Sequence, residues 1–361
     1  MRHSPVVAPL VGFALLLGGV ILPSNAILDL VRGIVLVAAV LAAVHHAEVV
    51  AHRVGEPFGS LVLAVAVTVI EVGLILTLTA GGGPGAETLG RDTVFAAVMI
   101  TCNGIVGAAI VAGVRRHDLV NFNAEGAGGA LATVITLAGL CFVLPNVTSA
   151  TPGPEFSPGQ LAFAAVASTA LYVLFVVTQT VRHRDFFLPV DDAGQAIEDV
   201  HADPPSPRTA WTSVGLLFTC LVAVVGLAKV ESKTIESLVA AAGLPQAVVG
   251  VVIALLVLAP ESLAAVRAAR RNRMQTSFNL AYGSAIASIG LTVPALALAT
   301  AWVDTPLLLG LQHMQPDDVG DTGPSDLDKA VRDDGSADAR ATLVGDGFVR
   351  DEGALDLGGA Q

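Results

Sequence analysis

Residues 59–80 read GSLVLAVAVTVIEVGLILTLTA, and this stretch decides the class of fold. It holds a single ionisable side chain, that of Glu71. An apolar run of about 20 residues is long enough to cross the hydrocarbon core of a bilayer as an α-helix. The stretch therefore predicts a membrane span with one carboxylate inside it.

The composition of the whole chain agrees with a membrane protein. Of its 361 residues, 53% are hydrophobic and 14% are charged, and the mean hydropathy is +0.72. Soluble domains carry about 25% charged residues, so this composition argues against a soluble enzyme. The sequence has no Walker loop, no Gly-x-Ser-x-Gly and no His-Glu-x-x-His motif, and no basic patch with interleaved aromatic residues. We therefore expect that the chain is not an enzyme and does not bind nucleic acid.

Further apolar runs of similar length predict an all-α polytopic membrane protein of about nine spans. The first run could instead be a cleaved signal peptide, because it follows the basic residue Arg2 and precedes small residues at 24–26. The nine runs cover residues 6–22, 27–46, 59–80, 92–114, 126–145, 159–181, 210–229, 244–267 and 275–302.

The distribution of basic residues predicts the orientation of the chain. Basic residues are enriched in the cytoplasmic loops of membrane proteins. With a cytoplasmic N-terminus, the outer loops contain only Arg91, Lys229 and Lys233. The cytoplasmic segments then contain eleven arginines, at positions 2, 53, 115, 116, 182, 184, 208, 267, 270, 271 and 273.

Two carboxylates inside predicted spans are the candidate functional residues. Ionisable residues within a bilayer are costly and mark ion or proton pathways. Glu71 lies in the third run, and Thr68 lies on the same helix face. Glu261 lies in the eighth run directly after Pro260. Since Pro260 lacks an N–H, it predicts an interrupted helix with a free carbonyl at Leu256.

Neighbouring runs offer further oxygen atoms. Ser284, Ser288 and Thr292 recur every four residues in the ninth run, and the fourth run contains Thr101 and Asn103. Packing between helices is the alternative role for such small polar side chains.

This collection of oxygen atoms fits a divalent cation. Ca²⁺ takes about six to eight oxygen ligands, and two carboxylates neutralise its charge. Two carboxylates close together in a low dielectric resist simultaneous ionisation, so protons rebind when the cation leaves. Without an ATP site, a secondary antiporter is expected. Its alternative cargo is Na⁺ or K⁺, for which one carboxylate charge suffices.

The order of these features indicates an internal repeat. A span with a glutamate precedes a span with small and hydroxyl-bearing residues in the third and fourth runs, and again in the eighth and ninth. The two pairs enter the membrane from opposite sides, which is typical of the inverted repeats of secondary transporters.

Two sequence blocks resemble the bacterial ChaA-type calcium/proton antiporters of the cation/calcium exchanger superfamily. The first block is HHAEVVAHRVGEPFGS at 45–60, running into VIEV at 69–72. The second comprises PESL at 260–263, RNR at 271–273, NL at 279–280, GS at 283–284 and LTVP at 291–294. The resemblance extends from about residue 6 to about residue 310.

The resemblance implies a fold, a location and a site. The fold has two inverted repeats of five helices after an extra N-terminal helix, which is kept in the mature protein and not cleaved as a signal peptide. The location is the bacterial inner membrane. Glu71 and Glu261 would be the paired carboxylates that bind the cation and exchange protons. Glu56 belongs to the first block, but a carboxylate before a proline at a helix start also has a purely structural role. The expected partners are the bilayer and the transported cations, with a homo-oligomer as an open option; no resident cofactor is expected.

The acidic end departs from the family pattern. From Leu311 to Gln361 the chain has 12 acidic and 4 basic residues. We expect a frameshift or truncation near Gln312 that removes the last two helices, with a genuine acidic extension as the alternative. A truncated membrane protein that does not transport is therefore a further alternative to an antiporter. The expected organisation is N-terminal helices (1–53), a first repeat core (54–181), a polar acidic loop (182–209), an incomplete second repeat core (210–310) and a disordered tail (311–361).

Overall fold

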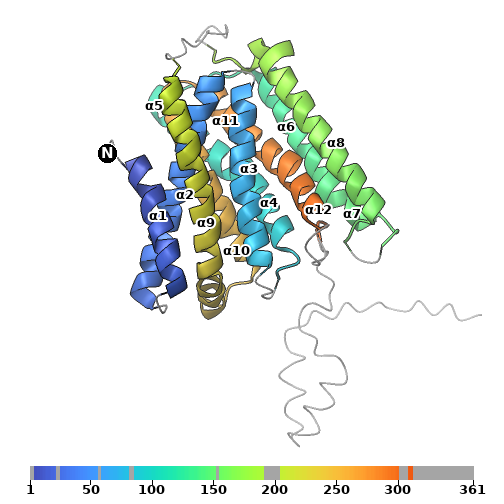
Figure 1. Cartoon of the computed structure of the whole chain (residues 1–361). Helices are drawn as coiled ribbons and strands as arrows, with labels where there is room; N and C mark the ends of the chain where they lie inside the picture. The colour runs from blue at the N-terminus through green and yellow to red at the C-terminus, as the bar shows by residue number, and fades with distance from the viewer. Residues whose placement is uncertain are drawn as a thin grey trace, which may run out of the picture. The chain divides into compact units, whose positions relative to one another are not determined.

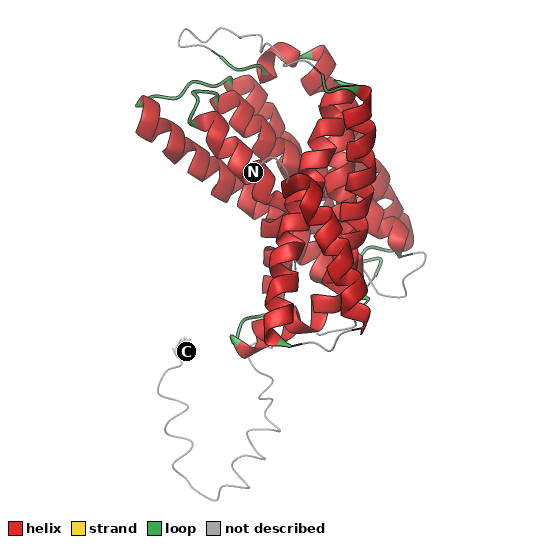
Figure 2. Ribbon diagram, turned by 60° about the vertical axis from the view of Figure 1, so that its left-hand side comes forward, coloured by secondary structure: helices red, strands yellow, loops and turns green. Residues whose placement is uncertain are grey.

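The computed structural model describes residues 4–21, 25–55, 58–80, 85–151, 154–190, 204–300 and 308–311. Every element within these ranges is helical (Figure 2). Glu56, most of the acidic loop and the tail after Leu311 lie outside the described residues.

Eight spans in the described residues are long and apolar enough to cross a membrane, and a shorter apolar helix, α1 (Ser4–Ile21), precedes them. This agrees with the nine predicted runs. Four of the spans are single α-helices: α2 (Ala26–Val54), α3 (Phe58–Thr79), α9 (Pro207–Ala241) and α10 (Ala247–Ala269).

The other four spans contain a π-helical segment. They are α4 (Leu89–Met99) with η1 (Ile100–Ile105) and α5 (Val106–His117), α6 (Ala124–Ala138) with η2 (Gly139–Val143) and α7 (Leu144–Val147), α8 (Pro158–Val177) with η3 (Thr178–Arg182), and α11 (Met274–Ala287) with η5 (Ser288–Thr292) and α12 (Val293–Ala299). A short 3₁₀ helix, η4 (Arg184–Phe187), follows η3.

The interruptions lie at these π-helical segments and not at Pro260, where the sequence predicted one. Helix α10 continues through Pro260 to Ala269, so that expectation is wrong. Proline removes one backbone hydrogen bond, and the neighbouring turns keep the helix intact. π-Helical turns inside helices are frequent at functional sites.

Helices α2 and α9 extend well beyond their predicted apolar runs. Hydropathy identifies only the apolar part of a helix, whereas its ends depend on capping. Asn25 caps α2, its side chain accepting a hydrogen bond from the backbone N–H of Leu28 at 2.9 Å. Gly55, with φ of +79°, ends the same helix.

The buried apolar side chains form two main cores. One joins α2 and α9 to faces of α3 and α10 and includes Val40, Ile70 and Leu227. The other joins α6, α8 and α11 and includes Leu137 and Ile286. Figure 1 shows α1, α2 and α9 on one side of the bundle and α6 and α8 on the other, with α3, α10 and α11 between them.

Candidate functional site

A cavity of about 240 Å³ lies between α3, α8, α10 and the span that contains α11 and η5. Both predicted carboxylates, Glu71 and Glu261, line it. They come from helices almost 200 residues apart in the chain, so only the packing of the two repeats brings them into one cavity.

Glu71 is 2% exposed and is held by two hydroxyl groups. Thr292 Oγ1 donates a hydrogen bond to Glu71 Oε2 at 2.8 Å, and Ser288 Oγ donates to the same oxygen at 3.2 Å. Both donors belong to η5, of which Ser288 is the first residue and Thr292 the last. Hydrogen bonds to an ionised acceptor are about twice as strong as neutral ones, so η5 fixes one oxygen of this carboxylate.

Glu261 has a different environment. Its Oε2 is buried and has no hydrogen-bond partner among the described residues. A buried carboxylate oxygen without a donor is unfavourable unless a cation or a proton satisfies it. The site therefore contains one carboxylate held by the protein and one with an oxygen available to a ligand.

The two glutamates occupy matching places in their helices. Glu71 is followed by eight residues of α3, which ends at Thr79, and Glu261 by eight residues of α10, which ends at Ala269. In each case the next span carries a π-helical segment, η1 or η5. This correspondence agrees with the repeat predicted from the sequence.

The supporting residues predicted from the sequence divide into two groups. Thr68, Ser284 and Ser288 line the cavity with the two glutamates. Asn103 does not line it; its Nδ2 donates to the carbonyl oxygen of Met99 at 3.1 Å, and its side chain is exposed. An amide that bonds to the preceding turn of its own helix is already satisfied, which explains why Asn103 lies apart from the carboxylates.

Several cavity residues escaped the sequence analysis. Tyr172 and Gln179 contribute from α8 and η3, and Thr276 and Asn279 contribute from α11. Asn279 Nδ2 also donates to the carbonyl oxygen of Phe187 at 2.6 Å, which ties η4 to α11. Gln179 could have been noticed as an amide within the apolar run 159–181. Asn279 belongs to the second sequence block, although no role in the site was expected of it.

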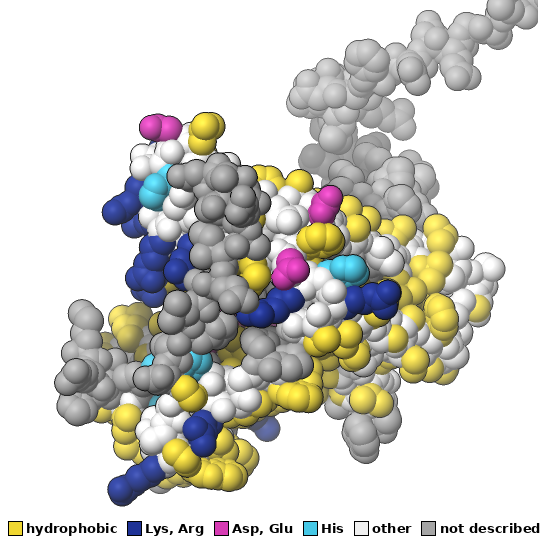
Figure 3. Space-filling model, turned by 90° about the horizontal axis from the view of Figure 1, so that it is seen from above, with side chains coloured by type: hydrophobic (Ala, Val, Ile, Leu, Met, Phe, Trp, Pro, Cys, Tyr) yellow, Lys and Arg dark blue, Asp and Glu magenta, His cyan; other side chains and the backbone are white. Residues whose placement is uncertain are grey.

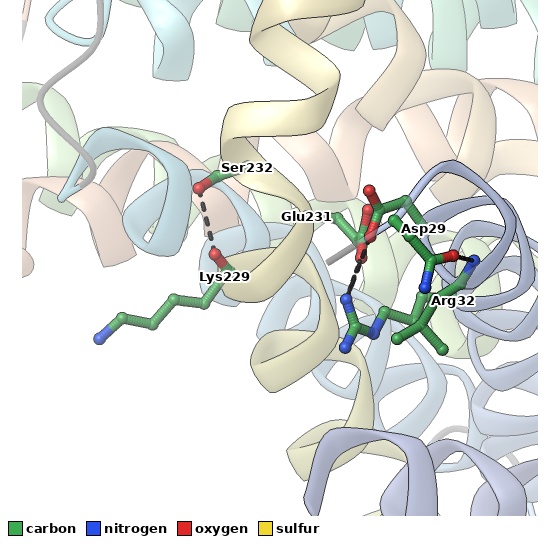
Figure 4. A network of polar contacts seen from close by, with 7 residues as sticks. Asp29, Arg32, Lys229, Glu231 and Ser232 are labelled. Carbon is green, nitrogen blue, oxygen red and sulfur yellow. Dashed lines mark hydrogen bonds and ion pairs between the residues drawn. The ribbon is translucent and has the colours of Figure 1, made fainter. Parts of the chain in front are cut away.

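A second cluster of buried charges, also missed, lies between α2 and α9 (Figure 4). Arg32 is fully buried, and its Nη1 lies 3.1 Å from Asp29 Oδ1 and 3.6 Å from Glu231 Oε1. Asp29 and Arg32 lie inside an apolar run, and the mean hydropathy of that run stays high despite its two opposite charges. The cluster does not line the cavity and joins the two long helices to each other.

Comparison with known proteins places the chain in a family. Residues 9–181 and 212–314 match the family model of the sodium/calcium exchanger protein. The putative ionic transporter y4hA of Sinorhizobium fredii is 45% identical over 319 residues, covering 86% of this chain and 85% of that protein. The sodium-potassium/proton antiporter ChaA of Escherichia coli is 35% identical over 278 residues, covering 77% and 75%.

Solved structures share the fold. Native YfkE superposes with a TM-score of 0.58 at 19% identity, covering 85% of this chain and 86% of that one. The H⁺/Ca²⁺ exchanger CAX gives a TM-score of 0.57 at 14% identity, covering 83% and 76%. With the family match over most of its length, the chain is a multi-pass membrane protein and belongs to the sodium/calcium exchanger protein family, within the bacterial cation/calcium exchanger superfamily.

Proposed function

We propose that the chain is an inner-membrane Ca²⁺/H⁺ antiporter that works by alternating access, with Glu71 and Glu261 as the exchanging carboxylates. The observation that carries this proposal is that both glutamates line one cavity inside the bundle. Neither has a basic partner there: the ion pairs among the described residues involve only Arg32 and Arg91. The charge of the two carboxylates must therefore be neutralised by something that enters the cavity.

Ca²⁺ and protons are the ligands that suit this site. Two carboxylates neutralise one Ca²⁺, and hydroxyl oxygens on Thr68, Ser284 and Ser288 are further ligands of the type that Ca²⁺ accepts. When Ca²⁺ leaves, the two negative charges face each other in a low-dielectric cavity. Protons then bind in its place, and this competition couples the two fluxes. The name of the H⁺/Ca²⁺ exchanger CAX, which shares the fold, agrees with this assignment.

The extent of the cavity supports an orientation. From Glu71 it reaches Leu63 near the start of α3, Gln179 in η3 and Thr276 near the start of α11. The excess of arginine assigns this end of the bundle to the cytoplasm. We therefore infer that the described conformation offers its site to the cytoplasm and that the N-terminus is cytoplasmic.

Exchange of Na⁺ or K⁺ for protons is the second candidate. It is favoured by the name of ChaA, the sodium-potassium/proton antiporter that is 35% identical to this chain. A monovalent cation needs the charge of only one carboxylate. In that case one of the two glutamates should be dispensable, whereas Ca²⁺ exchange should need both.

The test is proton flux in everted membrane vesicles after addition of Ca²⁺, Na⁺ or K⁺. Ca²⁺ exchange predicts that Glu71→Gln and Glu261→Gln each abolish Ca²⁺-dependent flux. The control is Glu87→Gln, which removes the same charge at an exposed position outside the cavity and should transport normally. Full Ca²⁺ flux in either cavity variant would contradict the site assignment. Flux driven only by Na⁺ or K⁺, and lost in one variant alone, would favour the second candidate.

A further inference from the structure

Two helix ends meet at the end of the bundle where α5 ends and α10 turns into α11. His117, the last residue of α5, donates a hydrogen bond from Nε2 to the carbonyl oxygen of Arg270 at 3.0 Å. Both chain segments turn sharply here, because Asp118 and Asn272 each adopt a φ of +59°. The basic residues of α5 and of the α10–α11 turn are thereby brought to one place.

Five arginines at this junction form what we call the arginine patch: Arg115, Arg116, Arg267, Arg270 and Arg271. All five are exposed, and none forms an ion pair with a residue that the structure describes. Figure 3, which views this end of the bundle, shows Lys and Arg side chains in several groups across it, with acidic side chains next to some of them. The patch therefore attracts an anion from outside the described part of the chain.

Apolar side chains lie next to the arginine patch on the membrane side. Val111 is four residues before Arg115 in α5, and Leu263 is four residues before Arg267 in α10. Residues four apart share a helix face, so Arg115 and Arg267 each have an exposed apolar side chain one turn deeper. Leu119, which follows α5, is 80% exposed. A ligand with an anionic group and an apolar chain would match both features.

Helix capping explains only part of this arrangement. Basic side chains in the last turn of a helix interact favourably with its dipole. That effect accounts for single arginines at each helix end, but it does not require two ends to be joined so that five arginines share one junction, where Asp118 is exposed and forms no ion pair with them among the described residues. Guanidinium groups pair with phosphate through two parallel hydrogen bonds, and such pairing offsets the repulsion among them.

We propose that the arginine patch binds the headgroup of an anionic phospholipid, whose acyl chains lie along Val111 and Leu263. Basic pockets between membrane helices commonly hold such headgroups. This binding is separate from cation exchange, because none of the five arginines lines the cavity of Glu71 and Glu261.

Native mass spectrometry and thermal unfolding of the purified full chain test this proposal. Phosphatidylglycerol should remain bound and raise the melting temperature, whereas phosphatidylcholine with the same acyl chains should do neither. Arg270→Gln/Arg271→Gln should retain at least about tenfold less phosphatidylglycerol, given the contribution of each basic residue near an anionic headgroup. The matched control is Arg184→Gln/Arg208→Gln, which removes the same charge from exposed positions at the same end but outside the patch.

Three results would overturn the proposal. The control double variant could lose the lipid as fully as the patch variant, which would indicate general surface charge. Inorganic phosphate could stabilise the chain as much as the lipid, which would indicate a site for a free anion. The patch variant could also retain the lipid unchanged. Because the readouts are lipid retention and melting temperature, failure here leaves the assignment of Ca²⁺/H⁺ exchange unaffected.

Discussion

Thr292 and Ser288 determine how Glu71 presents its charge. Both hydroxyl groups donate to Oε2, and neither contacts Oε1 within the described residues. One oxygen of this carboxylate is therefore fixed, while the other can turn to a ligand. Glu261, with a buried oxygen that has no donor, complements this arrangement.

Replacing Thr292 by Val should weaken cation binding. The change keeps the shape of the side chain and removes the shorter hydrogen bond, which is 2.8 Å long. A hydrogen bond to a charged group contributes about 1.5–3 kcal/mol, so the cation concentration for half-maximal flux should rise at least about tenfold. Ser288→Ala should have a smaller effect, because its bond is longer at 3.2 Å.

Thr133→Val is the control for this prediction. Thr133 also lies in a membrane helix, but its hydroxyl donates to the carbonyl oxygen of Gly129 and its half-buried side chain does not line the cavity. Half-maximal concentrations in vesicle flux should be unchanged by this substitution. An unaltered value for Thr292→Val would mean that the hydroxyl does not support the ionised carboxylate.

The sequence predicted which charged side chains line the cavity more reliably than which neutral ones do. Glu71 and Glu261 stand out because a carboxylate in an apolar run has few explanations. Asn103 and Ser288 look alike in sequence, yet only Ser288 reaches the cavity. A hydroxyl or amide can satisfy itself on its own helix, and only the packing of the helices decides which of them does so.

At the scale of elements, η5 places the hydroxyl groups against Glu71. A Cβ added to Gly290, in the middle of η5, would lie 2.7 Å from Tyr172 Cβ in α8. Glycine therefore lets this turn lie directly against α8, between the two residues that bind Glu71. The position of the turn depends on this close contact.

Gly290→Ala should consequently impair transport. The added methyl group must push η5 away from α8, which displaces Ser288 and Thr292 from the carboxylate. Overpacking of this kind typically costs about 1–3 kcal/mol. We expect the rate of cation-dependent proton flux in vesicles to fall at least about tenfold, with protein still present in the membrane.

Gly139→Ala provides the matched control. Gly139 begins the π-helical segment η2, and a Cβ added there meets nothing within 4 Å. Flux should stay near that of the unaltered chain. Equal loss in both variants would show that the effect comes from the helical propensity of alanine and not from contact with Tyr172.

Element positions were predicted well, but element ends and interruptions were not. The apolar runs located each span that the structure describes, because apolar surface must face lipid or core. They missed the final turns of α9, which continues to Ala241 through polar sequence. The π-helical segments have no sequence signature of their own, and the proline at 260 falsely suggested a break.

At the scale of the whole molecule, the Arg32 cluster joins helices from the two halves of the chain. Arg32→Met should leave the buried carboxylate of Glu231 and the half-buried carboxylate of Asp29 without their shared cation. Removing one partner of a buried ion pair costs about 3–5 kcal/mol. The melting temperature in detergent should drop clearly, and most of the loss should return in the neutral triple variant Asp29→Asn/Arg32→Met/Glu231→Gln.

Lys233→Gln is the control for the cluster. Lys233 lies two residues after Glu231 on α9, but it is exposed. Its replacement should leave the melting temperature within about one degree, as is usual for surface substitutions. If Arg32→Met has the same melting temperature as the unaltered chain, the charge cluster contributes no net stability.

The hydrogen-bond donors of Glu71 are synthesised long after Glu71 itself. Ser288 and Thr292 follow Glu71 by 217 and 221 residues in the chain. At about 5–20 residues per second, a ribosome needs roughly 10–45 s to synthesise that interval. During this time α3 holds a carboxyl group in the membrane before either donor exists, so this side chain must be protonated or hydrated until the last span arrives.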